Sequence, residues 1–358
     1  MSALKILQIN TEKGWRGGER QTLFTMKGLA RAGQDVRLVC LRDSPLARRA
    51  RAESVAVSEV KTQAGALRFL ATQGRDFDIL HAQTGRGQSL AVMTRPLHGR
   101  RIVYTRRVDF VPRGTLSLLK YHYTHQTVAI SQAIKDIMEG TLPGRQVEVI
   151  PSCLDTTVSL RSPSAEALSL QKRLAPRKII ACAAALVPHK DPLTLVRAAA
   201  RLREERAPDF VIVHFGRGPL EAEVRREISR LGLKRSYLLM GFEQDLESFF
   251  PVFDLFVMSS QEEGLGSSVL DAFRYRVPVV STEAGGLKDL VSGRGLICPV
   301  GDPVCLARSM ARVLRSPESL QDMTSKARAY VVREHSLEEM TRRYIRLYRQ
   351  VLNPAALT

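Results

Sequence analysis

The stretch SSQEEGLGSSVLD, residues Ser259–Asp271, combines a glycine loop with the start of a helix. The apolar run Asp254–Met258 directly before it predicts a buried strand. Gly264 and Gly266 permit a tight loop, and Ser268 with the aspartate three residues later predicts a capping box. A strand, a glycine loop and a helix N-terminus in this order present backbone N–H groups to an anion, usually a phosphate.

Two carboxylates accompany this loop, because Glu263 and Asp271 lie eight residues apart. Eight residues make about two helical turns, so both side chains can lie on the same side of the chain. A carboxylate accepts hydrogen bonds from a sugar diol, and acids beside a phosphate site therefore suit a phosphorylated sugar or a nucleotide-sugar. Ordinary helix capping by Ser268 and Asp271, with Glu263 in solvent, explains the stretch equally well.

The size and composition are those of a globular protein with two domains. The 358 residues exceed one typical core, and 44% of them are hydrophobic and 25% charged. The longest apolar run, Ile179–Val187, is too short to span a bilayer, and Lys5–Ile9 reads as a first strand, not a signal peptide. Five scattered cysteines without a CxxC pair indicate buried free thiols. We therefore expect a cytoplasmic protein.

The charge of the chain is strongly positive. Lysine and arginine number 54 against 36 aspartate and glutamate residues, which gives a net charge of +18. Such a field attracts nucleic acid, anionic lipid or a phosphorylated acceptor. The charge alone does not choose among these partners.

Short apolar strands alternate with helical patterns along the whole chain, which predicts an α/β fold with doubly wound parallel sheets. In the first half, strands are expected at Lys5–Ile9, Val36–Leu41, Ser54–Val60, Asp78–His81, Arg101–Thr105, Val128–Ile130 and Val147–Ile150. In the second half, they are expected near 178–184, 209–214, 236–240, 254–258, 277–281 and 295–298.

The strand pattern lapses between the two halves, where serine, proline and alanine are common. We expect an N-terminal Rossmann-like domain over residues 1–160, a linker over 161–177 and a C-terminal Rossmann-like domain over 178–335. Residues 336–358 are expected to form a helix that packs back on the N-terminal domain.

Residues with suitable chemistry follow many of these strands, and open α/β sheets bind ligands at the carboxyl ends of their strands. In the first half these residues are Gly17, Gly18, His81, Arg106, Arg107 and Asp109. In the second half they are His189, Lys190, Gly216, Arg217, Gly218, Gly241, Phe242, Glu263, Asp271 and the loop 284–286. Two such edges suggest a cleft between two domains.

Several of these segments together resemble the retaining, nucleotide-sugar-dependent glycosyltransferases of family GT4. WRGGERQ from Trp15 resembles the N-terminal glycine loop of the family, ALVPHKD from Ala185 its phosphate-binding segment, and FGRGPLEAEV from Phe215 its GxGP loop. EEGLGSSVLDA from Glu262 resembles the E-x7-E signature, and TEAGGLKDLV from Thr282 the loop after it. The resemblance covers nearly the whole chain and implies the GT-B fold, in which two Rossmann-like domains face a central cleft.

The resemblance also implies roles for individual residues. Lys190 would neutralise charge on the departing diphosphate, and Glu263 would orient the donor sugar; both are expected to be catalytic. The implied donor-binding residues are Gly17, Gly18, Gly216, Gly264, Leu265, Gly266, Ser267 and Asp271. We expect no covalent nucleophile, cofactor or metal, because lysine and helix dipoles supply the positive charge that the leaving group needs.

The chain departs from the family pattern at two donor-side positions. The second acid of the signature is Asp271, which is shorter than the usual glutamate. The arginine that normally precedes the phosphate-binding lysine by five residues is Ala185, which removes one cation unless Arg217 or Arg16 substitutes for it.

The acceptor-side candidates are His81, Arg106, Arg107 and Asp109. Adjacent side chains on a strand point in opposite directions, so one of the two arginines, which replace a histidine common in the family, should face an acceptor phosphate or carboxylate. The ordinary alternatives are that the two arginines form a basic rim, that His81 is only a histidine at a strand end and that Asp109 only forms a turn. A histidine pair at His122 and His125 has metal-like spacing but no visible third ligand, so we predict no metal site.

We therefore expect a retaining glycosyltransferase that moves a sugar from a nucleoside-diphosphate sugar to a cell-envelope or lipid-linked glycan, such as a lipopolysaccharide core. A GT-B sugar-nucleotide epimerase and a non-catalytic basic protein that binds polyanions are the alternatives. Nucleic acid is not an expected partner, because the basic residues are spread out and the signature is acidic. The basic, apolar segment Gly114–His125 could seat the protein on the inner face of an anionic membrane, or it could be a core helix with a basic outer face.

Overall fold

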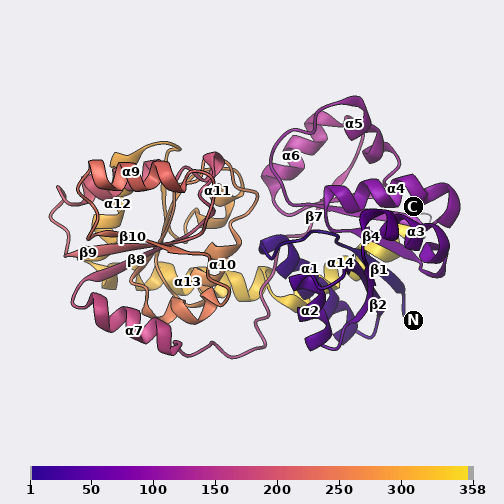
Figure 1. Cartoon of the computed structure of the whole chain (residues 1–358), viewed down its shortest axis with the longest axis horizontal. Coiled ribbons are helices and arrows are strands. Elements are labelled where there is room, and N and C mark those ends of the chain that lie inside the picture. Colours follow the sequence, from indigo (N-terminus) through magenta and orange to yellow (C-terminus); the bar gives the residue numbers. More distant parts are fainter. Residues whose placement is uncertain (1, 354–358) are drawn as a thin grey trace. The chain divides into compact units, whose positions relative to one another are not determined.

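The computed structural model describes residues 2–353, which form two compact units (Figure 1). Unit 1 contains the chain up to Asp155 together with the segment from Glu334 onward, and unit 2 contains Thr156–Arg333. The chain therefore passes between the units twice. Each unit is built on one parallel β-sheet with helices on both faces.

Unit 1 has a seven-stranded sheet in the order β3-β2-β1-β4-β5-β6-β7, and every neighbouring pair is parallel. Its strands are β1 Lys5–Ile9, β2 Asp35–Leu41, β3 Ala56–Val60, β4 Ile79–Ala82, β5 Arg101–Arg106, β6 Gln126–Ala129 and β7 Val147–Val149. The order reverses between β1 and β4, which is the ligand-binding point of doubly wound sheets.

Helices cover both faces of this sheet because the side chains of its strands alternate between the faces. Ile6 of β1 packs into one apolar cluster, and its neighbour Leu7 packs into the cluster on the opposite face. The helices are α1 Gly17–Arg31, α2 Pro45–Ala52, α3 Gln63–Gln73, α4 Gly85–His98, α5 Thr115–His122, α6 Gln132–Thr141 and the 3-10 turn η1 Gly74–Asp76.

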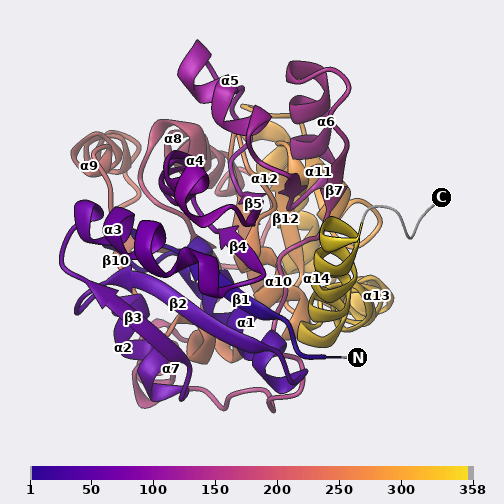
Figure 2. The same cartoon turned by 90° about the vertical axis from the view of Figure 1, so that its right-hand side faces the viewer.

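The helix α14, Leu337–Leu352, completes the core of unit 1 from the far end of the chain. It runs beside α1 (Figure 2), and its apolar stripe includes Met340, Tyr344 and Tyr348. The two helices approach so closely that a Cβ atom at Gly28 of α1 would lie 2.0 Å from Thr341 Oγ1. The missing side chain at Gly28 is therefore a requirement of this packing.

Unit 2 repeats the architecture with a six-stranded parallel sheet in the order β10-β9-β8-β11-β12-β13. Its strands are β8 Lys178–Ala183, β9 Phe210–Phe215, β10 Tyr237–Gly241, β11 Leu255–Met258, β12 Val279–Thr282 and β13 Leu296–Cys298. All six lie within two residues of the positions expected from the sequence. The two Rossmann-like sheets of the predicted fold class are confirmed.

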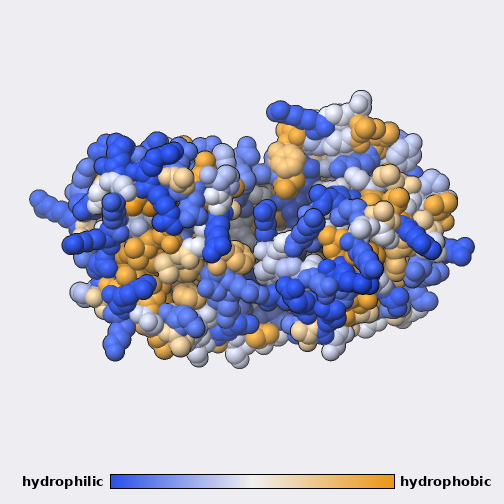
Figure 3. Space-filling view, viewed as in Figure 1, coloured by the Kyte–Doolittle hydropathy of each residue, from blue (hydrophilic) through white to orange (hydrophobic). Residues whose placement is uncertain are grey.

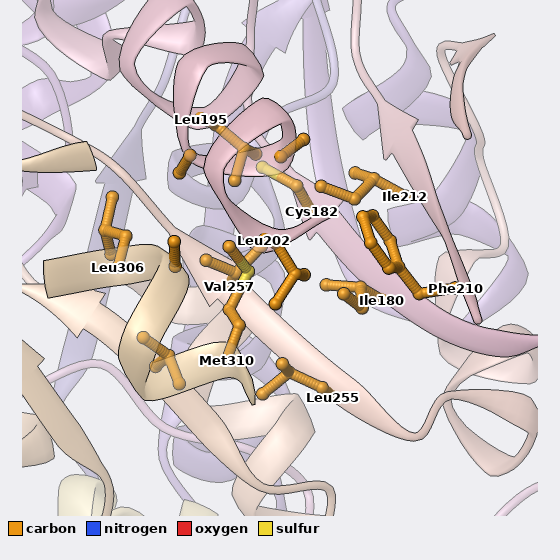
Figure 4. Close-up of a cluster of buried hydrophobic side chains, with 14 of the residues drawn as sticks. Ile180, Cys182, Leu195, Leu202, Phe210, Ile212, Leu255, Val257, Leu306 and Met310 are labelled. Carbon is orange, nitrogen blue, oxygen red and sulfur yellow. The ribbon is translucent and has the colours of Figure 1, made fainter. Parts of the chain in front are cut away.

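The core of unit 2 joins this sheet to the helices α8 and α12 (Figure 4). Ile180 and Val257 from the central strands meet Leu195 of α8 and Met310 of α12. The helices of the unit are α7 Ala165–Leu174, α8 Pro192–Leu202, α9 Glu221–Arg230, α10 Ser267–Arg274, α11 Gly286–Val291, α12 Pro303–Arg315 and α13 Gln321–Glu334. Its 3-10 turns are η2 Pro188–Lys190, η3 Leu246–Val252 and η4 Pro317–Leu320.

Two sequence expectations differ from the structure. The segment 161–177, expected to be a linker, contains α7, which is capped by Ser164 and packs against β8 and η3 in unit 2. Its leucines and alanines form a helical stripe that the expectation of a linker overlooked. The expectation of free thiols fails for Cys298 and Cys305, which form a disulfide, whereas Cys40, Cys153 and Cys182 are free and buried.

Within residues 2–353, no helix has both the length and the apolar character needed to cross a membrane.

Candidate active site

The loops at the carboxyl edge of the second sheet are held together by backbone hydrogen bonds. The N–H groups of Gln261 and Glu262 donate to the carbonyl of His189, at 2.9 and 3.1 Å. The N–H of Gly286 donates to the carbonyl of Glu263 at 2.8 Å. The loops after β8, β11 and β12 therefore form one platform at the point where the strand order reverses between β8 and β11.

Lys190 and Glu263 meet on this platform. The Lys190 Nζ atom lies 2.6 Å from Glu263 Oε2, and each side chain is less than one fifth exposed. Both residues were predicted from the sequence, but their direct contact follows from the fold, because 73 residues separate them in the chain. A lysine held by a half-buried carboxylate is a fixed cation, and an incoming anion can take the place of that carboxylate.

The loop after β9 approaches the loop after β8 so closely that it requires two glycines. A Cβ atom at Gly216, where φ is +150°, would lie 1.9 Å from the carbonyl oxygen of Ala184. A Cβ atom at Gly218 would lie 2.3 Å from the carbonyl oxygen of Leu186. Gly216 is thus placed on the same platform as Lys190 by backbone contacts alone.

The helix α10 begins at Ser267 after Gly266, whose φ of +87° favours glycine. The predicted capping box is wrong, because Ser268 does not cap the helix and its Oγ faces the carbonyl of Ala183 at 3.5 Å. The N-cap residue is Gly266, which has no side chain to cap the first N–H groups of α10. The loop Gly264–Gly266, with buried Leu265, therefore places a helix N-terminus without an N-cap side chain at the edge of the sheet.

Asp271 lies deeper than the other predicted donor residues. It occupies the second turn of α10, is 3% exposed and already has an interaction partner. The structure therefore brings Lys190, Glu263, Gly216 and the start of α10 to one edge of unit 2, with Asp271 inside the helix layer behind them.

Arg217, which was expected at the strand edge and as a substitute for the missing family arginine, is a cation of this platform. Its side chain is exposed and has no hydrogen bond or ion pair within residues 2–353. Its Nε atom would lie 3.3 Å from a Cβ atom at Gly241, and its carbonyl accepts from the N–H of Leu186 at 3.2 Å. The guanidinium thus belongs to the loop that packs on Ala185.

In unit 1, Gly17 and Gly18 form the first turn of α1, directly after the loop that follows β1. The carboxylate of Glu19 accepts from the N–H of Arg16 at 2.9 Å, and burial raises its pKa. A Cβ atom at Gly18 would lie 3.7 Å from Arg107 Cδ, so this turn of α1 and Arg107 are neighbours. Glu19 was missed by the sequence analysis, although an acid three residues after a helix start is a capping signal.

Two of the four acceptor-side candidates are inside the protein. His81 is fully buried, and its ring nitrogens face Tyr348 Oη at 2.7 Å and Thr105 Oγ1 at 2.8 Å. Burial and the nearby Arg107 charge lower its pKa to about 3, so it is a neutral core histidine. Arg106 is buried as well and donates to Tyr121 Oη and to the carbonyl of Phe110.

Arg107 and Asp109 remain as acceptor-side candidates. Arg107 points away from Arg106, as expected for neighbours at a strand end, and donates to Gln83 Oε1 in the loop after β4. Its Nε atom is buried without a partner, and burial lowers the pKa of its guanidinium. Asp109 is half-buried in the loop after β5. Residues 2–353, which include His122 and His125, contain no group of three or more potential metal ligands.

Two family models match the chain and together span most of it. The model described as "Glycosyltransferase Family 4" matches residues 15–158, and the model described as "Glycosyl transferases group 1" matches residues 169–330. The chain belongs to glycosyltransferase family 4. This glycosyltransferase has its two matched segments in the two units of the fold.

Curated relatives of this glycosyltransferase are distant. The chain is 25% identical over 288 residues to the putative glycosyltransferase EpsD of Bacillus subtilis, which covers 74% of this chain and 75% of EpsD. It is 27% identical to the lipopolysaccharide core biosynthesis glycosyltransferase LpsE of Rhizobium meliloti, over 43% of this chain and 44% of LpsE. The match to LpsE, like those to several other curated relatives, spans less than half of the relative's length.

Solved structures share the fold at low sequence identity. Anabaena Alr3699/HepE in complex with UDP and glucose has a TM-score of 0.84 and 18% identity, over 97% of this chain and all of that chain. The lipopolysaccharide outer core galactosyltransferase WaaB has a TM-score of 0.69 and 14% identity over the same share of this chain. These likenesses establish the GT-B architecture.

Proposed function

We propose that this glycosyltransferase is a retaining enzyme that transfers a sugar from a nucleoside-diphosphate sugar to a cell-envelope glycan. The observation that carries the proposal is the Lys190–Glu263 pair at the switch point of the second sheet. A cation and a carboxylate at one point fit the two ends of such a donor, whose diphosphate is anionic and whose sugar carries hydroxyl groups.

The diphosphate takes over the Lys190 Nζ atom, assisted by N–H groups at the start of α10, where the N-cap residue Gly266 has no side chain. Glu263, released from its ion pair, accepts hydrogen bonds from the sugar hydroxyls and orients the anomeric carbon. Gly216 and the loop Gly264–Gly266 let the donor approach the backbone closely. Asp271, which lies behind the loop, accepts hydrogen bonds from the ribose hydroxyls.

In the proposed reaction, the bond between the anomeric carbon and the diphosphate oxygen breaks, and the nucleoside diphosphate leaves with the electron pair. The acceptor hydroxyl forms the new bond on the same face and gives its proton to the departing diphosphate. Lys190 neutralises the developing charge, so the step needs neither an enzymic nucleophile nor a divalent metal. Full activity in excess EDTA is the expected result, and loss of activity in EDTA would contradict the metal-free step.

The acceptor is proposed to be a lipopolysaccharide-core-like or lipid-linked glycan that carries a phosphate or carboxylate. Arg107 supports this class, because a guanidinium binds such groups with two parallel hydrogen bonds. Asp109 in the same loop would accept from an acceptor hydroxyl, and Gly18 would leave room beside Arg107. The names of LpsE and of the Rhizobium meliloti mannosyltransferase LpsB, both of lipopolysaccharide core biosynthesis, agree with this choice.

The test is a thermal-shift panel of UDP-, GDP-, ADP- and CMP-sugars on the wild-type protein and on Lys190→Ala. A shift with one nucleotide class, lost in the variant, is the expected result. Lys178→Ala is the matched control, because Lys178 also forms an ion pair, with Asp254 at 2.9 Å, but at the start of β8. No shift with any sugar nucleotide, or an equal shift in Lys190→Ala, would contradict the proposal.

Product analysis separates transfer from the epimerase alternative. We expect nucleoside diphosphate to be released in proportion to acceptor glycosylation, with the α-configured donor giving an α-linked product. Release of free nucleotide in the absence of any acceptor would favour epimerase or hydrolase chemistry.

A further inference from the structure

Large hydrophobic side chains are exposed on one region of unit 1. They are Met93 and Leu97 of α4, Val108, Phe110 and Val111 of the loop after β5, and Leu116, Leu119 and Tyr123 of α5 and its C-cap. Leu116 is 83% exposed and Met93 66%. We call these eight residues the α4–α5 surface, and Figure 3 shows hydrophobic atoms over the position of α5.

The helix α5 turns its apolar stripe outward. Leu116, Leu119 and Tyr123 recur at intervals of three and four residues and therefore share one face. Tyr121, about half a turn away, is the buried residue of the helix and packs on Tyr104. A helix of a globular protein normally places its apolar stripe against the core, so this outward stripe calls for a covering partner.

Contacts within unit 1 join the parts of this surface. The guanidinium of Arg95 in α4 lies over the Tyr123 ring, 5.6 Å from its centre. The guanidinium of Arg106 lies over the Phe110 ring at 5.2 Å and also donates to Tyr121 Oη, which ties the loop after β5 to α5. The exposed apolar side chains therefore lie on segments that are joined to one another by these contacts.

The same region is almost free of negative charge. Between Asp78 and Asp136, Asp109 is the one acidic residue, against nine lysine and arginine residues. Arg95, Arg113 and Lys120 lie among the exposed apolar residues. Lys120 reaches the carbonyl of Gly85 at 3.4 Å, and burial and the Arg106 charge lower its pKa.

We propose that the α4–α5 surface binds an anionic lipid bilayer, with Leu116, Leu119 and Phe110 inserted below the headgroups. Aliphatic and aromatic side chains ringed by cations are the composition of an interfacial membrane-binding face. A surface that binds nucleic acid presents polar side chains and aromatic side chains that stack on bases, and Leu116 and Met93 are neither polar nor aromatic. The surface does not use the Lys190 platform, so this inference stands independently of the proposed donor chemistry.

The test is flotation of the full-length protein with vesicles of phosphatidylglycerol and phosphatidylethanolamine, compared with vesicles of phosphatidylcholine alone. We expect binding to the anionic vesicles only, with about a fivefold loss of partitioning for each cation that is removed, as in Arg113→Gln. The double variant Leu116→Ser, Leu119→Ser should lose at least tenfold, because each leucine contributes buried apolar area.

The matched control is Leu168→Ser, Val332→Ser, which removes two similarly exposed hydrophobic residues from unit 2 and should bind as the wild type does. Equal binding to both vesicle types, no binding, or unchanged binding of the Leu116–Leu119 variant would each overturn the proposal. Nucleotide-sugar thermal shifts on the same variants separate the two hypotheses. Vesicle binding without any donor shift would leave the membrane surface in place and overturn the glycosyl donor site.

Discussion

An exposed guanidinium lies beside the position where the family places an arginine. Arg217 sits in the loop that packs on Ala185, and a Cβ atom at Gly216 would lie 3.4 Å from Ala185 Cα. Within residues 2–353, Arg217 has no side-chain partner to compete with a phosphate. A donor diphosphate held by Lys190 would therefore find its second cation on the neighbouring loop.

We predict that Arg217→Ala weakens binding of a nucleoside diphosphate about tenfold to a hundredfold, because a charge-assisted hydrogen bond contributes about 1.5–3 kcal/mol. Binding of the nucleoside monophosphate should change much less, and Arg217→Ala with Ala185→Arg should recover affinity. Isothermal titration calorimetry provides the comparison. The control is Arg201→Ala, an exposed arginine at the far end of α8, and an equal effect in that control would refute the assignment.

A second prediction at this scale concerns Gly216. Its φ of +150° and the 1.9 Å approach to the Ala184 carbonyl leave no room for a methyl group. Gly216→Ala should therefore lower stability by about 2 kcal/mol or more and abolish the donor-induced thermal shift. Gly140→Ala, in α6 with open space around it, should leave the shift unchanged. Chemical denaturation and the thermal-shift assay measure the two effects.

At the scale of elements, α14 supplies one of the two hydrogen-bond partners of a histidine from the middle of the first sheet. His81 of β4 faces Tyr348, and Thr105 of β5 shares a hydrogen bond with Tyr344 at 2.9 Å. Gln83 extends this network to Arg107. One network of polar side chains thus joins the carboxyl end of β4 to α14 inside an apolar core.

This network predicts acid destabilisation of unit 1. Burial lowers the pKa of His81 to about 3, whereas an unfolded histidine titrates near 6.5. Between these values the unfolded chain binds a proton that the folded chain does not, so stability falls as the pH falls from 6.5 to 3. The slope should approach about 1.4 kcal/mol per pH unit for this histidine and become shallower in His81→Gln. Urea denaturation at several pH values tests this prediction, and the same slope in the wild type and in His81→Gln would refute it.

Much of the fold could be predicted at this scale, because strand and helix patterns are local. The six strands of unit 2 fell within two residues of their expected positions, and the glycine loops lie at the predicted edge. Contacts across the sequence could not be predicted in this way. His81 meets a tyrosine 267 residues away, and Lys190 meets a carboxylate 73 residues away. The pattern around His81 is that of an exposed strand end, and only the return of α14 makes it a core residue.

At the scale of the whole molecule, unit 1 is assembled from two segments of the chain, and unit 2 lies between them in sequence. Leu337, Met340, Tyr344, Leu347 and Tyr348 are all part of the unit 1 core. The backbone joins the segments as well, because the N–H of Leu154 donates to the carbonyl of His335 at 2.8 Å.

We predict that a chain ending at residue 333 keeps unit 2 folded and loses unit 1. Removal of α14 exposes several large apolar side chains on one face of the first sheet. The free energy lost with their burial exceeds the free energy of unfolding of a typical domain. Hydrogen exchange should show protected amides in β8–β13 and rapid exchange in β1–β7. Protection in both sheets of the truncated chain would mean that α14 only covers a core that is stable without it.

The double passage between units has a consequence for synthesis on the ribosome. Unit 1 begins before unit 2, yet it lacks a core helix until α14, which follows unit 2 in the chain, has been made. Unit 2 is contiguous, so it can fold while the nascent chain is still attached. The first sheet must wait with one face only partly covered, and unit 1 is therefore completed after unit 2, although its synthesis starts earlier.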